Sequence, residues 1–254
     1  MEVHHHAHDP AAPHHKKNWK SYLWEFVMLF LAVFCGFLAE YQLEHVIEHQ
    51  REKEYIESMI EDAKADTANI SKAIVENTRR VLHLDSLANL CSSYSGKATE
   101  DSLLYRHYIY GLIHPAVISP TERTLIQLKN AGGMRLIRNK TAVDSIILYD
   151  DMAKKLSDQR SFYELYQNNS IALASTIFSF KKLGIGVSNS QVKDSANKGG
   201  YFKLFSNDKT KLMEFANTIF VYEGVVQYYN ALLKEMNEHA VNLQNSLRKE
   251  YHLD

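Results

Sequence analysis

Histidine is the chemically active residue type that the chain concentrates most strongly, close to its amino terminus. The positions are His4, His5, His6, His8, His14 and His15, out of 13 histidines in all. Neutral imidazoles this close together can chelate Zn, Ni or Cu ions. The interrupted sequence HHHAH is unlike a designed expression tag. We interpret residues 1–18 as a solvated, histidine-rich tail and keep metal binding by this tail as an alternative.

A second histidine pair falls in the sequence His45-Val46-Ile47-Glu48-His49. This matches H-x-x-E-H, in which two histidines on one helical face hold zinc and the glutamate acts as a base. The match lies in a glutamate-rich stretch with no cleft in prospect, and so short a pattern arises easily by chance. A weak metal site formed by His45 and His49 is therefore the alternative that we keep, and a protease is not.

Other reactive side chains have structural interpretations. Cys91 falls on an expected apolar helix face, where a free cysteine serves as a small hydrophobe. The run Tyr105, Tyr108 and Tyr110 with His107 could form a sugar-binding or partner surface, but aromatic stripes on helices usually fill cores. No phosphate-binding loop, dinucleotide-binding motif or nucleophile motif occurs in the sequence. We expect no enzymatic activity and no cofactor.

Lysines accumulate between Lys181 and Lys211, where two aspartates oppose them. The candidates for contact with lipid phosphates or an anionic partner are Lys181, Lys182, Lys193, Lys198 and Lys203. Solvated charge is the simpler interpretation, because exposed ion pairs contribute only about 0–1 kcal/mol each. Acidic and basic residues balance over positions 41–254, which argues against nucleic acid as a partner.

The element that must position these groups begins with an apolar stretch from Tyr22 to Ala39, in which Glu25 is the only charge. Its length is close to the minimum for a hydrocarbon core of about 30 Å. Trp19 and Tyr41 lie where aromatic rings favour the membrane interface. We predict a transmembrane helix over residues 19–41. The alternatives are a buried core helix and a cleaved signal peptide, for which Phe37 is too large at the required position.

Within this predicted helix, Glu25 can reach back to the headgroups or contact another membrane subunit. Ala32, Gly36 and Ala39 form a face of small residues that would let another helix approach closely. Three cations, Lys16, Lys17 and Lys20, lie before the apolar stretch. Three carboxylates, Glu40, Glu44 and Glu48, follow it. The positive-inside rule therefore places the amino-terminal tail in the cytoplasm and residues 42–254 on the other side.

Only 10 glycines and 4 prolines among 254 residues indicate an all-α fold. Neither residue type occurs between Phe37 and Ser95, so the membrane helix is expected to continue without interruption. Two coiled-coil-like heptad patterns follow. The first comprises Ile60, Ala63, Thr67, Ile70, Ile74, Asn77, Val81, Leu84, Ala88 and Cys91, and the second comprises Phe215, Ile219, Tyr222, Val226, Tyr229, Leu233, Met236, Ala240, Leu243 and Leu247.

Three further helices are expected between these two patterns: residues 102–113, a helix opened by a capping box at Ser119–Glu122 and closed at Gly132-Gly133, and a helix from Asn139 or Thr141 to about Phe180. The last helix should start near Asn207 or Asp208. Short connections favour antiparallel neighbours. We therefore expect strict alternation of five helices in an antiparallel bundle. The lysine-rich loop should then lie beside the acidic stretch Glu44–Asp66 or compete with it for the same surface.

Several segments together resemble a group of uncharacterised single-pass membrane proteins of Gram-negative bacteria, some of which are classed only as domains of unknown function. They are HHHAH, WEFVMLFLAVFCGFLAE, REKEYIESMIEDAKADTANI and LIQLKNAGGMRLIRNK. The resemblance covers about the first seventy residues and residues 120–155, and excludes Cys35, Gly36 and the lysine-rich loop. It implies an envelope location, here the inner membrane with a periplasmic domain, and a helical architecture. It implies no activity.

We therefore expect a membrane-anchored, non-enzymatic periplasmic helical scaffold, or an accessory subunit of a larger envelope complex. Its partners would be the lipid bilayer and either other membrane subunits or further copies of the chain, because long apolar helix faces would otherwise stay uncovered. The alternative is a ligand-sensing helical module that signals through its membrane helix to the histidine tail.

Overall fold

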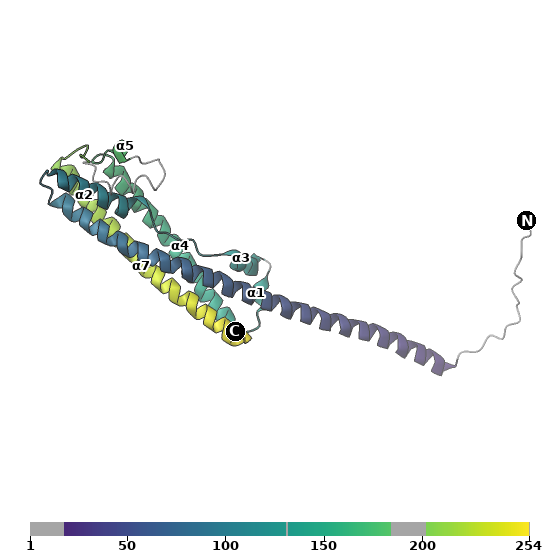
Figure 1. Ribbon diagram of the computed structural model, residues 1–254. Helices are drawn as coiled ribbons and strands as arrows, with labels where there is room; N and C mark the ends of the chain where they lie inside the picture. The colour runs from purple at the N-terminus through teal and green to yellow at the C-terminus, as the bar shows by residue number, and fades with distance from the viewer. Residues whose placement is uncertain (1–17, 131, 184–201, 254) are drawn as a thin grey trace, which may run out of the picture. The chain divides into compact units, whose positions relative to one another are not determined.

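The computed structural model describes residues 18–130, 132–183 and 202–253, and these residues form helices without any strand (Figure 1). The all-α prediction is thus confirmed for the described chain. The elements are α1 (Trp19–Ser92), α2 (Ala98–Tyr108), the π-helix η1 (Ile109–Ile113), α3 (Arg123–Asn130), the 3₁₀ helix η2 (Gly133–Leu136), α4 (Lys140–Ala174), α5 (Phe180–Leu183) and α7 (Lys209–Tyr251). The chain divides into two compact units, Met1–Arg51 and Glu52–Asp254.

The described part of the first unit consists of the amino-terminal part of α1, whose side chains are exposed almost throughout. An 18-residue window of this helix has a mean hydropathy of 2.0 and none of it is buried. Phe26, Phe30 and Phe34 stack on one another along one face. A helix that is apolar and fully exposed is not the core helix of a soluble domain, and this one is long enough to cross a membrane.

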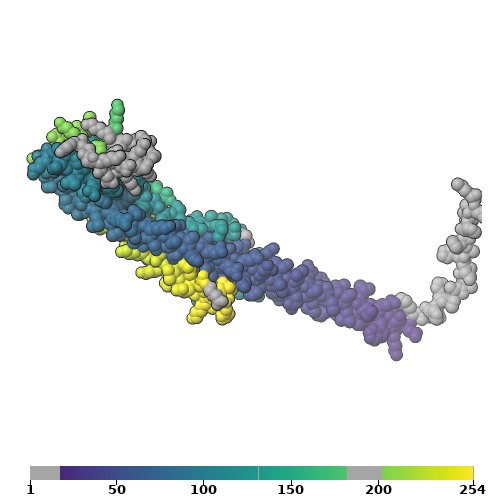
Figure 2. All heavy atoms as spheres, in the orientation of Figure 1, coloured from purple at the N-terminus to yellow at the C-terminus, as the bar shows by residue number. Residues whose placement is uncertain are grey.

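In the second unit, α1 from Glu52 onward lies beside α4 and α7 (Figures 1 and 2). The second heptad pattern is confirmed, because all of its members are buried along α7. The first pattern is half right. Along α1 the buried rows are Ile56, Ala63, Ile70, Asn77, Leu84 and Cys91, alternating with Met59, Asp66, Ala73, Arg80 and Leu87.

The second of these rows differs from the expected one by one position. Thr67, Ile74, Val81 and Ala88 were expected inside and are only partly buried, whereas Ile60 is buried as expected. Asp66 and Arg80 take the inward positions instead, with exposed fractions of 1% and 4%. Polarity alone argues for an outward position for both residues. Their burial therefore requires partners from elsewhere in the fold.

Those partners come from the segment between α1 and α4. Arg80 donates from Nη1 to the carbonyl oxygen of Gly111 over 2.8 Å, and Asn77 donates to the carbonyl of Ala116 over 3.0 Å. Further along, Asp66 accepts from the backbone N–H of Thr121. Irregular backbone next to a core needs such hydrogen bonds, because unpaired peptide groups are costly to bury. The polar row of α1 supplies them.

The amino terminus of α3 shows the same principle and corrects the predicted capping box. The helix begins at Arg123, and Asp62 of α1 accepts hydrogen bonds from the backbone N–H and the hydroxyl of Thr124. Asp66 accepts from the backbone N–H and the hydroxyl of Thr121. Carboxylates are stabilised at a helix amino terminus by the free N–H groups and the helix dipole. Two residues from another helix thus replace the expected local cap.

The directions of the helices also differ from the expected alternation. Tyr149 donates to Asp66 and Tyr163 donates to Asn77, so α1 and α4 run in the same direction. α7 runs opposite to both: Tyr251 donates to Glu52 at one end of α7, and Ser246 is hydrogen-bonded to Ser145 of α4.

The reason is that α2, η1, α3 and η2, residues 98–136, all follow α1 in one direction, from its carboxyl-terminal end back toward Glu52. We call this segment the descending arm. Gly111 lies at the level of Arg80, Thr121 at the level of Asp66, and Arg138 donates from its backbone N–H to Glu52. The prediction assigned opposite directions to the two helices of this segment. In the structure the whole segment runs antiparallel to α1, so the next helix, α4, runs parallel to α1.

Candidate functional site

Of the predicted metal ligands, only His45 and His49 fall within the described residues. His4, His5, His6, His8, His14 and His15 lie outside the described residues. His45 lies on α1 with its Nδ1 atom 3.8 Å from the carboxylate of Glu48, and its ring packs edge-on against Tyr41. His49 is exposed one turn further along. Among the described residues no group of three histidine, cysteine or carboxylate side chains is placed to hold a metal ion.

The small face of the apolar helix is open. Glu25, Ala32, Gly36 and Ala39 are all exposed on α1, and a Cβ atom added to Gly36 would meet nothing within 4 Å. The close helix approach that these residues would permit stays a prediction.

The described lysines lie away from the acidic stretch of α1. Lys181 in α5 and Lys203 are exposed, whereas Lys193 and Lys198 lie outside the described residues and only the helical backbone of Lys182 is described. The carbonyl of Lys203 accepts from the hydroxyl of Tyr105 in α2. That places Lys203 at the Cys91 end of the bundle, and Glu52–Asp66 lies at the other end. The expected proximity of lysine-rich and acidic stretches is therefore wrong for Lys203.

Cys91, Tyr105 and Tyr108 serve the core, as predicted, whereas Tyr110 and His107 are only partly buried. Cys91 is 3% exposed, and burial raises the pKa of its thiol to about 12, which leaves the thiol protonated and unreactive at neutral pH. Tyr105 and Tyr108 are fully buried and pack against Phe178. The interpretation as a sugar-binding stripe is thus not supported for these two rings.

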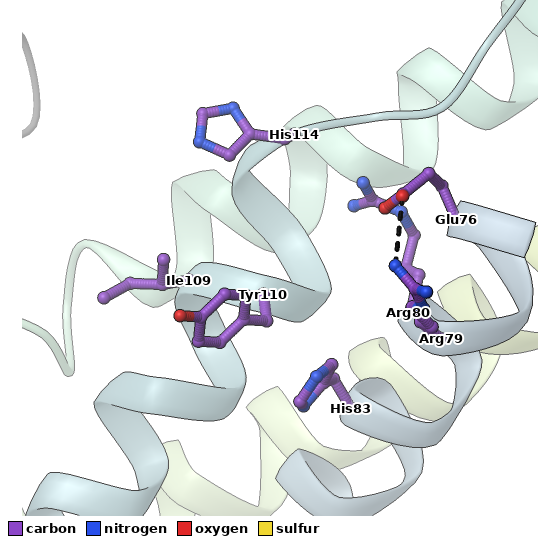
Figure 3. A pocket seen from close by; sticks show the side chains of 7 residues that line it. All are labelled: Glu76, Arg79, Arg80, His83, Ile109, Tyr110 and His114. Atoms are coloured by element: carbon purple, nitrogen blue, oxygen red, sulfur yellow. Dashed lines mark hydrogen bonds and ion pairs between the residues drawn. The ribbon is translucent and has the colours of Figure 1, made fainter. Parts of the chain in front are cut away.

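A pocket that sequence patterns did not indicate lies between α1 and η1. α1 contributes Arg79, Arg80 and His83, with Glu76 at the rim, and the other wall carries Tyr110 and His114 (Figure 3). Its volume is about 330 Å³. Arg79 is exposed and pairs with Glu76 over 3.3 Å. The pocket therefore has an exposed, compensated ion pair at its edge and a buried guanidinium in its wall.

The backbone of η1 shapes this wall. A π-helix has a wider turn than an α-helix and often occurs at functional sites. A Cβ atom at Gly111 would lie 3.2 Å from a methyl group of Leu84, so the glycine lets η1 approach α1 closely. The same glycine presents the carbonyl that accepts from Arg80. Arg80 is thereby held with one nitrogen occupied, and its Nε atom is buried without a hydrogen-bond partner.

A histidine pair adjoins Arg80. The Nδ1 atoms of His83 and His107 lie 3.1 Å apart, so one ring donates and the other accepts. Burial lowers the pKa of His83, and the charges of Arg106 and Arg80 lower it further. Burial lowers the pKa of His107 as well, with smaller effects from His83 and Arg106. Both rings are therefore neutral at pH 7, and His83 stacks on Tyr110.

Sequence patterns gave no signal for this site, because the expected heptad placed Val81 on the inward face where the structure places Arg80. Comparison of the chain with protein-family models, with curated proteins and with solved structures gives no match.

Proposed function

We propose that this protein is a membrane-anchored helical scaffold, or an accessory subunit of a larger cell-envelope complex, without an enzymatic activity of its own. The observation that carries the proposal is the exposed apolar part of α1, because the same helix enters the core of the second unit. A lipid anchor and a structural rod are thus one element. The amino-terminal lysines favour a cytoplasmic tail and a periplasmic bundle.

The way the second unit uses its polar side chains supports a structural role. Asp62, Asp66 and Glu52 accept backbone and side-chain hydrogen bonds that hold the descending arm against α1. Carboxylates that act in catalysis must instead face a bound reactant. These three carboxylates accept hydrogen bonds within the fold.

Exposed apolar side chains on the bundle favour contact with further subunits. Phe220 is 71% exposed on α7, and Phe162 is 56% exposed on α4. Single exposed hydrophobes are ordinary, but paired with a membrane anchor they suit side-by-side assembly.

The test is extraction of the native, untagged chain in mild detergent, followed by mass measurement and identification of copurifying proteins. We expect a species heavier than one chain after subtraction of detergent. A single monomer of 29.2 kDa with no associated protein would rule the scaffold function out.

The second candidate is a ligand-sensing module that signals through α1 to the histidine tail, and the pocket beside Arg80 is the observation that favours it. In a sensor of this kind, the histidine-rich residues 1–18 would recruit a separate partner protein. Pull-down with the full chain and with a chain lacking residues 2–15 separates the two functions. Partners retained without the tail support the scaffold, whereas partners lost with the tail support the sensor. Metal titration of the tail tests the remaining alternative.

A further inference from the structure

The geometry points to the pocket between α1 and η1 as a binding site for the oxyanion group, carboxylate or phosphate, of a small soluble molecule. The site goes beyond a scaffold function and does not depend on it. Its central group is Arg80, and its walls are the exposed face of His83 and the ring of Tyr110.

Arg80 is buried without a counter-charge among the described residues. Its side chain is 4% exposed, yet its described hydrogen bond goes to a neutral carbonyl, that of Gly111. No carboxylate within the described residues forms an ion pair with it. A buried charge without a counter-charge is costly, and buried arginines are normally paired. An anion in the adjoining pocket would supply the missing charge.

The direct hydrogen bonds to described residues do not use the full donor capacity of the Arg80 guanidinium. Gly111 occupies Nη1, and Nε is buried without a direct hydrogen-bond partner. Burial raises the pKa of the Tyr222 phenol, and Arg80 lies close enough to that hydroxyl to lower the pKa against this larger effect. Arginine binds carboxylate and phosphate through two parallel N–H groups, and Nε belongs to one of the two edges suited to this geometry. The fold thus holds Arg80 through Gly111 and places it beside Tyr222, and a ligand in the pocket that Arg80 lines would use the remaining donor capacity.

The charges around the pocket also favour an anion. Arg79 adds a second guanidinium, and Arg106 is close enough to His83 to lower the pKa of that ring. Glu76 is the one acidic side chain among the lining residues, and Arg79 already compensates it (Figure 3). The net field favours an anion over a cation, which also argues against a metal ion held by His83 and His107.

The histidine pair would adapt to the anion. If His107 donates from Nδ1 to His83, then His83 carries its proton on Nε2 and becomes a hydrogen-bond donor. The opposite tautomer would present a lone pair, which an oxyanion repels. Selection between the two tautomers lets neutral rings contribute a donor without a proton being taken up.

The volume of about 330 Å³ suits a small molecule and is too small for a folded partner. The flat ring of Tyr110, stacked on His83, offers an apolar surface for the body of such a ligand.

The test is isothermal titration of the full chain in detergent at pH 7.5 with inorganic phosphate and, separately, with succinate, each at constant ionic strength set by chloride. We expect saturable binding of at least one anion with a Kd of about 1 mM or tighter. Arg80→Met should weaken this binding at least about tenfold, because a charge-assisted hydrogen bond is lost. Absence of saturable binding by the native chain for both anions would overturn the proposal.

Two exposed positions on α1 keep the test decisive even if Arg80→Met fails to fold. Glu76→Gln removes the acidic group from the rim and should tighten binding by about two- to fivefold. Lys72→Gln changes the charge of the same helix at an exposed position outside the pocket lining and should leave the affinity unchanged. Equal affinities for the native chain and Glu76→Gln, or a loss with Lys72→Gln as large as with Arg80→Met, would contradict a site at this pocket.

Discussion

Replacement of Asp66 by alanine should destabilise the fold, because this side chain joins α1 to the descending arm and to α4. The carboxylate is 1% exposed and accepts from the backbone N–H of Thr121 at 2.9 Å, from the Thr121 hydroxyl at 2.7 Å and from the hydroxyl of Tyr149. Burial raises the pKa of Tyr149, and the hydrogen bond to Asp66 raises it further, so the phenol stays a donor at any pH of interest. Alanine leaves all of these donors without their acceptor.

The expected cost follows from the donors that lose their partner. A buried donor left unsatisfied costs about 1–3 kcal/mol. Thr121 is half-buried and both hydroxyls can rotate toward water or another acceptor, so the sum is reduced. We expect Asp66→Ala to lower the free energy of unfolding by about 3–4 kcal/mol. Asp66→Asn keeps one accepting oxygen and should cost about 1–2 kcal/mol.

The assay is urea unfolding of the full chain in detergent, followed by far-ultraviolet circular dichroism. Glu61→Ala is the matched control, because it removes an exposed carboxylate from the same helix and should change stability by no more than about 0.5 kcal/mol. If Asp66→Ala and Glu61→Ala unfold at the same urea concentration with equal slopes, the role assigned to the buried carboxylate is refuted.

Three further results are expected. Burial lowers the pKa of His83 and of His107, so the unfolded chain binds protons more readily than the folded chain. The free energy of unfolding should therefore fall as pH drops from 7.5 through the ordinary histidine pKa of 6.5. His107→Gln should reduce this pH dependence, and an unchanged dependence would contradict the role of the histidine pair. Gly133→Ala should destabilise by about 1–2 kcal/mol because its Cβ atom would lie 3.2 Å from Leu128, whereas Gly224→Ala, with nothing within 4 Å, should stabilise by about 0.5–1 kcal/mol; thermal unfolding distinguishes the signs. The native chain should remain in the membrane pellet after alkaline carbonate extraction, and Val33→Arg, at a cost of about 2.5–3.5 kcal/mol, should release a measurable fraction; a native chain that is extracted would disprove the anchor.

Local patterns were sufficient to predict much of the helical framework. The buried face of α7 follows from its apolar heptad, because burial of one stripe depends only on the spacing of side chains along the helix. Asn139 and Asp208 cap α4 and α7, each accepting from the backbone N–H three residues on, and Gly132 adopts a positive φ after α3. These features involve neighbours in sequence, so the residue types suffice to predict them.

Long-range pairing decided the remainder. The sequence by itself determined an all-helical chain with one exposed apolar segment and a long uninterrupted first helix, since composition and period specify both. Only the tertiary structure turned Asp66 and Arg80 inward, gave α4 the same direction as α1, and set η1 opposite Arg80 to form the pocket. A polar side chain becomes stable in a core only when its partner arrives from a distant segment, and no local period records which segment that is.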